Sequence, residues 1–217
     1  HFPSTWLRLD KLGDMPPSGG DFQFYKNLKV EPMLAKQVTT YFAEILKTNG
    51  RIEQFIDSDY TYMNQTLAKW IYKREGIRGE RLRKVKLDDP RRGGIFTQPG
   101  LMTATANGVD TSPVVRGVWV LENILGTPPS PPPPDVEPLP VDTSQATSIR
   151  ERLELHRKNE ACNSCHVKID PMGFAFENFD VVGRWRERYK RAKGPIDTSA
   201  TMANGTEIAD IVAFKKM

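Results

Sequence analysis

The sequence predicts a mainly α-helical protein in which two helical parts are joined by a proline-rich linker. Apolar residues recur at helical spacing in several segments of both parts, and capping residues and glycines mark where these segments begin and end. A run rich in proline between residues 127 and 140 separates the two parts, and such a run favours an extended, stiff chain. We therefore expect a helical domain over residues 1–126, a linker over 127–146 and a second domain over 147–217.

Three helices are expected in the first part. The first follows Pro32, which suits a first helical turn, and it ends before an Asn-Gly pair. The second is capped by Asp59 and stops near Gly76, and the third begins with Ser112 as its N-cap. Between residues 84 and 110 the apolar pattern loosens, which indicates loops and short strands.

The second part is expected to begin with a helix capped by Ser148 that leads into a pair of cysteines. A loop-rich region with several aromatic residues follows, from Phe174 to Trp185. The last element is a predicted helix over residues 207–216, because its isoleucine and valine residues form one helical stripe.

Composition limits the kind of protein. The chain has 217 residues and a formal net charge of +4, and its charges are interspersed. Nucleic-acid binding favours a concentrated basic stripe, so the charge pattern does not indicate a nucleic-acid-binding protein. No stretch is apolar enough for a membrane span, and two cysteines do not make a disulfide scaffold. A mildly basic surface suits docking to an acidic redox partner. Because the first residue is His1, we expect a processed form or a piece of a longer protein.

The chemistry is expected at Cys162-Asn163-Ser164-Cys165-His166. Two thiols at this spacing can add to the two vinyl groups of one haem, and the adjacent histidine then binds the iron. A redox dithiol would favour a βαβ context, which the pattern lacks. A zinc site needs four ligands, but the chain has three histidines and no second cysteine pair. Buried structural cysteines are a further alternative that the spacing permits. Among these interpretations we expect one covalent haem c.

The second part resembles a small class I cytochrome c, in which a helix, the haem motif, loops, a ligand-bearing loop and a terminal helix follow in this order. The resemblance implies that Arg184 directs its guanidinium to a haem propionate, a role that suits the bidentate geometry of arginine. A surface arginine is the alternative interpretation. The neighbouring Trp185 is also expected to contribute to the haem pocket. The resemblance implies that Met202, just before the last element, is the sixth iron ligand.

The identity of the sixth ligand stays open at this point. His156 lies on the helix that leads into the motif, which should pack beside the haem rather than over its distal face. Met172 follows the motif closely and is expected on the proximal side. Met102, in the first part, could take the place of Met202, and the sixth position could also be empty.

A closer resemblance covers almost the whole chain. It is to the exported multidomain cytochromes typical of planctomycetes and related bacteria, and it is carried by residues 6–12, 57–64, 91–95, 111–123, 162–166 and 169–180. The resemblance implies redox chemistry in the periplasm or at the cell surface, and further domains or haems upstream in a longer chain. It implies no particular substrate.

Three functions are compatible with these observations. The first is electron transfer by a haem that is ligated on both axial faces. The second is a haem enzyme, such as a peroxidase or oxidase, with an open sixth position. The third is a structural or assembly module in which the haem serves as a relay. The coordination state of the iron distinguishes the first two, and concentration-dependent assembly identifies the third.

Overall fold

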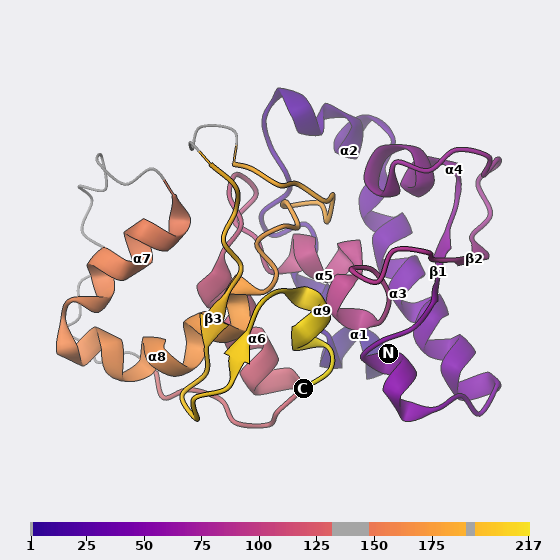
Figure 1. Cartoon of the computed structure of the whole chain (residues 1–217). Coiled ribbons are helices and arrows are strands. Elements are labelled where there is room, and N and C mark those ends of the chain that lie inside the picture. The colour runs from indigo at the N-terminus through magenta and orange to yellow at the C-terminus, as the bar shows by residue number, and fades with distance from the viewer. Residues whose placement is uncertain (1, 132–147, 190–193) are drawn as a thin grey trace. The chain divides into compact units, whose positions relative to one another are not determined.

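A computed structural model of the chain describes residues 2–131, 148–189 and 194–217 (Figure 1). The described chain is mainly helical with a few short strands, which confirms the predicted fold class at this level. It divides into two compact units that are described separately below. Unit 1 comprises His1–Ser112, Phe179–Trp185 and Ile211–Met217, and unit 2 comprises Pro113–Asn178 and Arg186–Asp210. No helix among the described residues is long and apolar enough to cross a membrane.

Unit 1 is built mainly from helices, with one antiparallel pair of strands. Its helices are α1 (Phe2–Trp6), α2 (Gln23–Asn27), α3 (Val30–Lys47), α4 (Gln65–Leu67), α5 (Pro99–Ala104) and α9 (Ile211–Phe214), and its strands are β1 (Tyr60–Met63) and β2 (Arg83–Lys86). A π-helical turn, Ala68–Tyr72, continues α4. Turns of 3-10 helix lie at Leu9–Lys11, Gly20–Phe22, Ile52–Phe55 and Ile95–Thr97.

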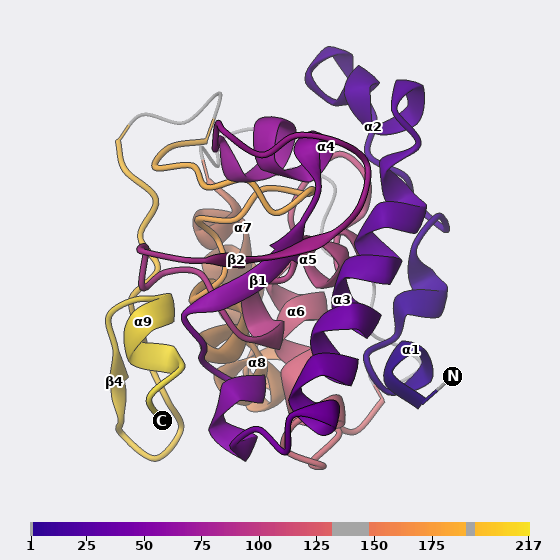
Figure 2. The same cartoon turned by 90° about the vertical axis from the view of Figure 1, so that its right-hand side faces the viewer.

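The long helix α3 matches the first predicted helix and organises unit 1. Its apolar residues, spaced by three and four positions, form one buried face that includes Leu34, Val38 and Tyr41. The helix runs beside strand β1 (Figure 2). The wholly buried Gln37 Nε2 donates to the carbonyl oxygen of Tyr62, so one polar side chain joins the helix to the strand.

The helix predicted from Asp59 is wrong in its first turns. Residues Tyr60–Met63 form strand β1 instead, and they pair antiparallel with β2, Tyr60 opposite Lys86. Aromatic and β-branched residues favour a half-buried strand, and this preference and the pairing outweigh the helical spacing of the apolar residues. The helix begins only after Asn64, whose side-chain oxygen accepts the Leu67 N–H at 2.9 Å as an N-cap.

Segments distant in the sequence complete unit 1. Val182 lies in the apolar core formed with residues of α2, α3 and α4. Arg92 Nη1 donates to the Gly183 carbonyl oxygen at 2.7 Å. Near the C-terminus, Lys215 Nζ donates to Asp57 Oδ1 at 2.5 Å. The C-terminal third of the chain therefore supplies structural parts to the unit that the N-terminus begins.

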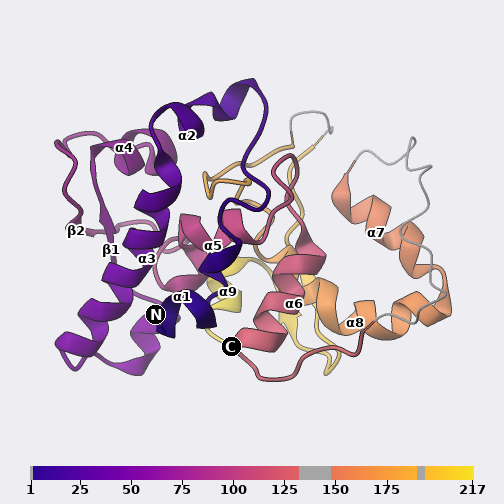
Figure 3. The same ribbon diagram turned by 180° about the vertical axis from the view of Figure 1, so that it is seen from behind.

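Unit 2 contains helices α6 (Pro113–Asn123), α7 (Ile149–Arg157) and α8 (Glu160–Phe174) and the strands β3 (Ala200–Thr201) and β4 (Glu207–Ile208). A turn joins α7 to α8, and the two helices contact each other (Figures 1 and 3). Helix α7 starts where the sequence predicts, because Ser148 Oγ accepts the Glu151 N–H at 3.1 Å.

Helices α6 and α8 pack closely against each other in unit 2. A Cβ atom added at Gly117 would fall on the Ile169 carbonyl oxygen, and one added at Gly173 would fall on the Pro113 carbonyl oxygen. Only glycine permits backbones to approach so closely. Alongside, the buried Arg116 donates from Nη1 to the Phe176 carbonyl oxygen at 2.9 Å, which fixes α6 against the end of α8.

The compact units do not follow the predicted domain boundaries. Helix α6 was expected in the domain 1–126, yet its glycine contact with α8 places it in unit 2. Residues 179–185 and 211–217 were expected in the domain 147–217, yet they belong to unit 1. Most of the predicted linker 127–146 lies outside the described residues.

The predicted terminal helix over residues 207–216 is also wrong in its first half. Glu207–Ile208 forms strand β4, which pairs antiparallel with β3, so that Ile208 lies opposite Ala200. Ile208 is buried. Only Ile211–Phe214 is helical, as α9. A stripe of apolar residues over so short a segment does not separate a strand followed by a turn of helix from one continuous helix.

Candidate functional site

The cysteine motif lies in the first turns of α8. Asn159 caps this helix, because its Oδ1 accepts the Ala161 N–H at 3.0 Å. Cys162 is buried, whereas Cys165 and His166 are partly exposed. Residues three and four positions apart lie on the same side of a helix. The structure therefore brings both thiols and the imidazole of the predicted motif to one side of α8.

The His166 ring is held in place by Asp170, one helical turn further along α8. Its Nδ1 lies 2.8 Å from Oδ1 of Asp170, whose side chain has no exposed surface. An ionised carboxylate only accepts hydrogen bonds, so this contact favours the tautomer with the ring proton on Nδ1. The other ring nitrogen, Nε2, then presents its lone pair and can bind a metal ion.

Arg157, at the end of α7, lies on the other side of this carboxylate. Its Nη1 is 3.9 Å from Asp170 Oδ2, and its Nε donates to Asn163 Oδ1 at 3.2 Å. The Oδ2 atom accepts no hydrogen bond within the described part of the chain. Arg157 therefore links α7 to α8 and only partly balances the buried negative charge.

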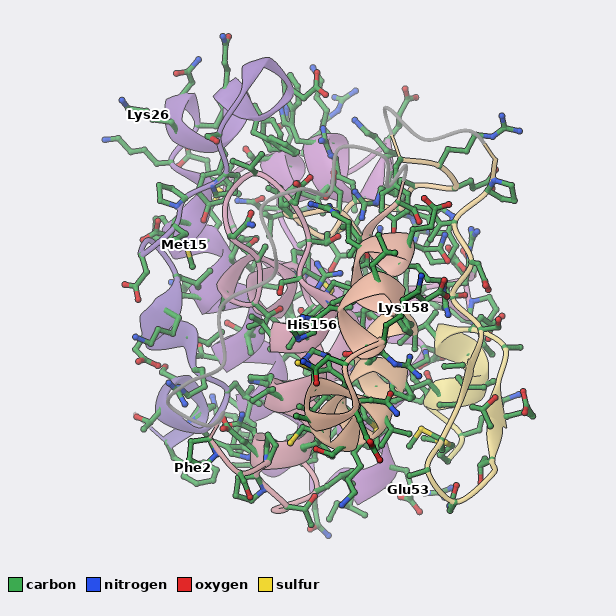
Figure 4. The ribbon with its side chains drawn as sticks, turned by 90° about the vertical axis from the view of Figure 1, so that its left-hand side faces the viewer. Phe2, Met15, Lys26, Glu53, His156 and Lys158 are labelled. Carbon is green, nitrogen blue, oxygen red and sulfur yellow. The ribbon has the colours of Figure 1, made fainter. Side chains whose placement is uncertain are left out.

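His156 also faces the motif. Its ring meets the His166 ring edge to face, with centroids 4.9 Å apart and planes at 73°. Burial, followed by the neighbouring His166, lowers the pKa of His156. Figure 4 looks onto helices α7 and α8 and labels His156. Two imidazoles on opposite sides of one iron would have centroids about 6 Å apart, given metal–nitrogen bonds of roughly 2 Å. In the described arrangement His156 lies beside His166 rather than opposite it.

The methionines considered as sixth ligands lie on three different elements. Met202 occupies the turn between β3 and β4, where its N–H donates to the Thr206 carbonyl oxygen at 2.8 Å. Strand β3, immediately before it, contacts α8. Met172 is buried within α8 itself, six residues after His166. Met102 is buried in α5 of unit 1.

Arg184 and Trp185 both belong to unit 1 and have partners there. Arg184 Nε donates to Asp180 Oδ2 at 2.7 Å. The Arg91 guanidinium lies 4.2 Å from the centroid of the Trp185 ring, and Phe179 packs edge to face on that ring. The predicted contacts of Arg184 and Trp185 with a haem stay predictions.

Sequence reasoning missed Asp170, the residue that anchors His166. The spacing of four positions was present in the sequence, but it places two side chains together only in a helix. Pro171 favoured an end to the helix at this point, since proline lacks an N–H and clashes with the preceding turn. Helix α8 nevertheless continues through Pro171 to Phe174.

Comparison with protein families gives two matches. Residues 1–72 match PSD4, a protein of unknown function (DUF1592), and residues 92–189 match PSCyt3, a protein of unknown function (DUF1588). Both domains are typical of planctomycete-type cytochrome c proteins. The second match includes the motif from Cys162 to His166. No curated protein and no solved structure matches the chain.

Proposed function

We propose that this chain is a c-type cytochrome that carries one covalent haem and transfers single electrons outside the cytoplasm. The observation that carries the proposal is the set of donors on α8. Two thiols and an imidazole lie on one side of the helix, and the Nδ1 of that imidazole is held by Asp170. This donor set fits a haem c, which supplies a one-electron iron couple when bound.

Cys162 and Cys165 would hold the group covalently. Each thiol adds across one vinyl double bond, so that a carbon–sulfur bond forms and the thiol hydrogen moves to the neighbouring vinyl carbon. The addition consumes no oxidant. The helix sets the separation of the two sulfur atoms, because Asn159 caps it immediately before the motif.

His166 would bind the iron through Nε2, since its Nδ1 is engaged by Asp170. We propose Met202 as the ligand on the opposite face. It follows β3, which packs against α8, and its turn is closed by the hydrogen bond to Thr206. Two fixed axial ligands suit electron transfer, because the coordination sphere then changes little with the oxidation state.

Location and partners follow from this chemistry. Covalent attachment of haem to a motif of this kind requires export, so we propose a periplasmic or cell-surface location. The formal net charge of +4 suits an acidic redox partner, whose encounter would be steered electrostatically. Further domains or haems of a longer chain are also expected partners.

Optical spectroscopy with carbon monoxide tests electron transfer against the haem-enzyme alternative. The reduced protein should show a low-spin spectrum that carbon monoxide leaves unchanged, because both axial positions are filled. A high-spin spectrum, or one that shifts when carbon monoxide binds, would instead support an enzyme with an open sixth position.

The Met202→Ala variant tests the sixth ligand. In the oxidised wild-type protein, sulfur ligation should give a weak far-red charge-transfer band, and this band should be lost in the variant. The reduction potential should fall as well, since methionine ligation raises it. Met172→Leu is the matched control, because Met172 lies in α8 beside the motif, and it should keep the band. An unchanged spectrum and potential in Met202→Ala would exclude Met202 as the ligand.

A further inference from the structure

We propose that Asp170 is a positioning residue for His166, and that its negative charge lowers the reduction potential of the haem iron. This inference rests on the proposed function, because it concerns the ligand of a haem that Cys162 and Cys165 would hold. It adds a residue outside the haem motif to the proposed site and gives the direction in which that residue shifts the potential.

The geometry of the pair supports a fixed orientation. Both residues belong to α8, and the 2.8 Å separation of His166 Nδ1 and Asp170 Oδ1 is short for a hydrogen bond from nitrogen to oxygen. Asp170 has no exposed surface, and His166 is 16% exposed. The hydrogen bond is therefore largely shielded from water, which would otherwise compete for both partners.

The charge around the pair supports an effect on the iron. Arg157 Nη1, 3.9 Å from Oδ2, is the ion-pair partner that faces this carboxylate from α7, and at this distance the balance is incomplete. His156, also from α7, packs edge to face on the His166 ring, with ring centroids 4.9 Å apart. Much of the negative charge of Asp170 thus acts on the imidazole.

The direction of the effect follows from the chemistry of the ligand. A carboxylate that accepts the Nδ1 proton makes the histidine a stronger donor through Nε2. A stronger donor, together with a nearby negative charge, stabilises the ferric state more than the ferrous state. Hydrogen bonding to the axial ligand and burial are among the means by which a protein adjusts a haem potential. Asp170 should therefore lower the potential.

A purely structural role for Asp170 makes a different prediction. If the carboxylate served only to connect α7 and α8 through Arg157, its replacement would lower the stability of unit 2 and leave the potential unchanged. The potential and the iron–histidine bond therefore discriminate between the two roles.

The decisive variant is Asp170→Asn, made in the whole chain and measured after haem has been attached. Asparagine keeps an oxygen that can accept the Nδ1 proton but removes the charge. Mutation of a residue that hydrogen-bonds a metal ligand typically changes the metal affinity by about tenfold or more. We expect a tenfold change in the equilibrium constant for reduction, which raises the potential by about 59 mV for one electron. The iron–histidine stretching frequency should also fall. It is measured by resonance Raman spectroscopy of the ferrous form, after photolysis of the bond between the iron and the sixth ligand.

Two further variants complete the experiment. Asp170→Glu restores the charge and should return the potential most of the way to that of the wild type. Glu154→Gln removes one exposed carboxylate from α7 of the same unit and should leave the potential unchanged. Equal potentials in the wild type and Asp170→Asn, with haem bound in both, would overturn the inference and leave the proposed function intact.

A failure of Asp170→Asn to acquire haem also gives an answer. In that case the wild-type protein, labelled with nitrogen-15 in its histidines, is studied by nuclear magnetic resonance. A His166 Nδ1 proton protected from exchange with solvent would support the hydrogen bond to Asp170, and an unprotected proton would overturn it. A wild-type protein that takes up no covalent haem under haem-attaching conditions would overturn the proposed function itself.

Discussion

Asp89 in unit 1 shows how the neighbours of one carboxylate determine its contribution to stability. Burial acts to raise the pKa of Asp89, but hydrogen bonds from the side chain and backbone of Arg91 outweigh it, so the pKa is lowered. The Arg91 Nε lies 2.7 Å from Asp89 Oδ1. A carboxyl with a lowered pKa in the folded state stabilises the protein above its unfolded-state pKa, and this contribution is lost as the pH falls through the folded-state pKa.

We expect Asp89→Asn to lower the free energy of unfolding at pH 7 by less than about 1 kcal/mol, because the side chain is 35% exposed and solvent screens the pair. The difference from the wild type should shrink below about pH 4 and vanish in stronger acid. Urea denaturation across this range measures it. Asp88→Asn, at a neighbouring position that is 78% exposed, is the control and should show a smaller difference. A difference that persists at low pH would contradict the assignment to charge.

The residues of the motif were predictable from sequence, whereas their support was not. The spacing of Cys162, Cys165 and His166 is sufficient to predict that they share one face of a helix, because local geometry places them there. Asp170 and Arg157 join this site only because α8 continues through a proline and α7 turns back on it. Neither condition can be deduced from the spacing of residue types.

Between elements, the contact of α6 with α8 depends on two glycines. We expect Gly117→Ala to destabilise unit 2 by roughly 2 kcal/mol or more, because the added methyl group meets the Ile169 backbone, which cannot move aside as a side chain can. Thermal or urea unfolding followed by circular dichroism measures the loss. The matched control is Gly20→Ala, where nothing lies within 4 Å of the added atom. Equal stability of the two variants would contradict the close packing of these helices.

Helix starts were predicted better than strands. Ser148 and Ser112 precede helices α7 and α6 as expected, because an N-cap acts on the backbone within a few residues. The strands β1 and β4 were mistaken for helix because each is defined by its pairing: β1 pairs with β2 across the intervening α4, and β4 pairs with β3 across a short turn. Pairing between separate segments decides such short stretches, and a local pattern does not contain that information.

At the scale of the whole molecule, the two units exchange segments of chain. The part before the proline-rich run contributes α6 to unit 2, and the part after it contributes residues 179–185 and 211–217 to unit 1. The sequence predicted two separately folding parts because it shows only where the chain changes composition. The exchange depends on contacts within each unit, such as those of Gly117 and Lys215.

This exchange predicts the behaviour of a cleaved chain. A protease site inserted between Val141 and Ala146 should permit cleavage into two fragments that stay together in gel filtration and separate only in denaturant. The Gly117→Ala variant, cut in the same way, should release its fragments at a lower urea concentration. Fragments of the wild-type chain that elute separately without denaturant would contradict the assignment of α6 to unit 2.

Covalent haem attachment is the claim on which the account of function depends. The most direct test is the intact mass of the chain under denaturing conditions, after export in a bacterium that attaches haem to such motifs. The wild-type mass should exceed that of the polypeptide by one haem, and the Cys162→Ser, Cys165→Ser double variant should show the polypeptide mass alone. A wild-type chain without added mass, or a double variant that keeps it, would contradict the account.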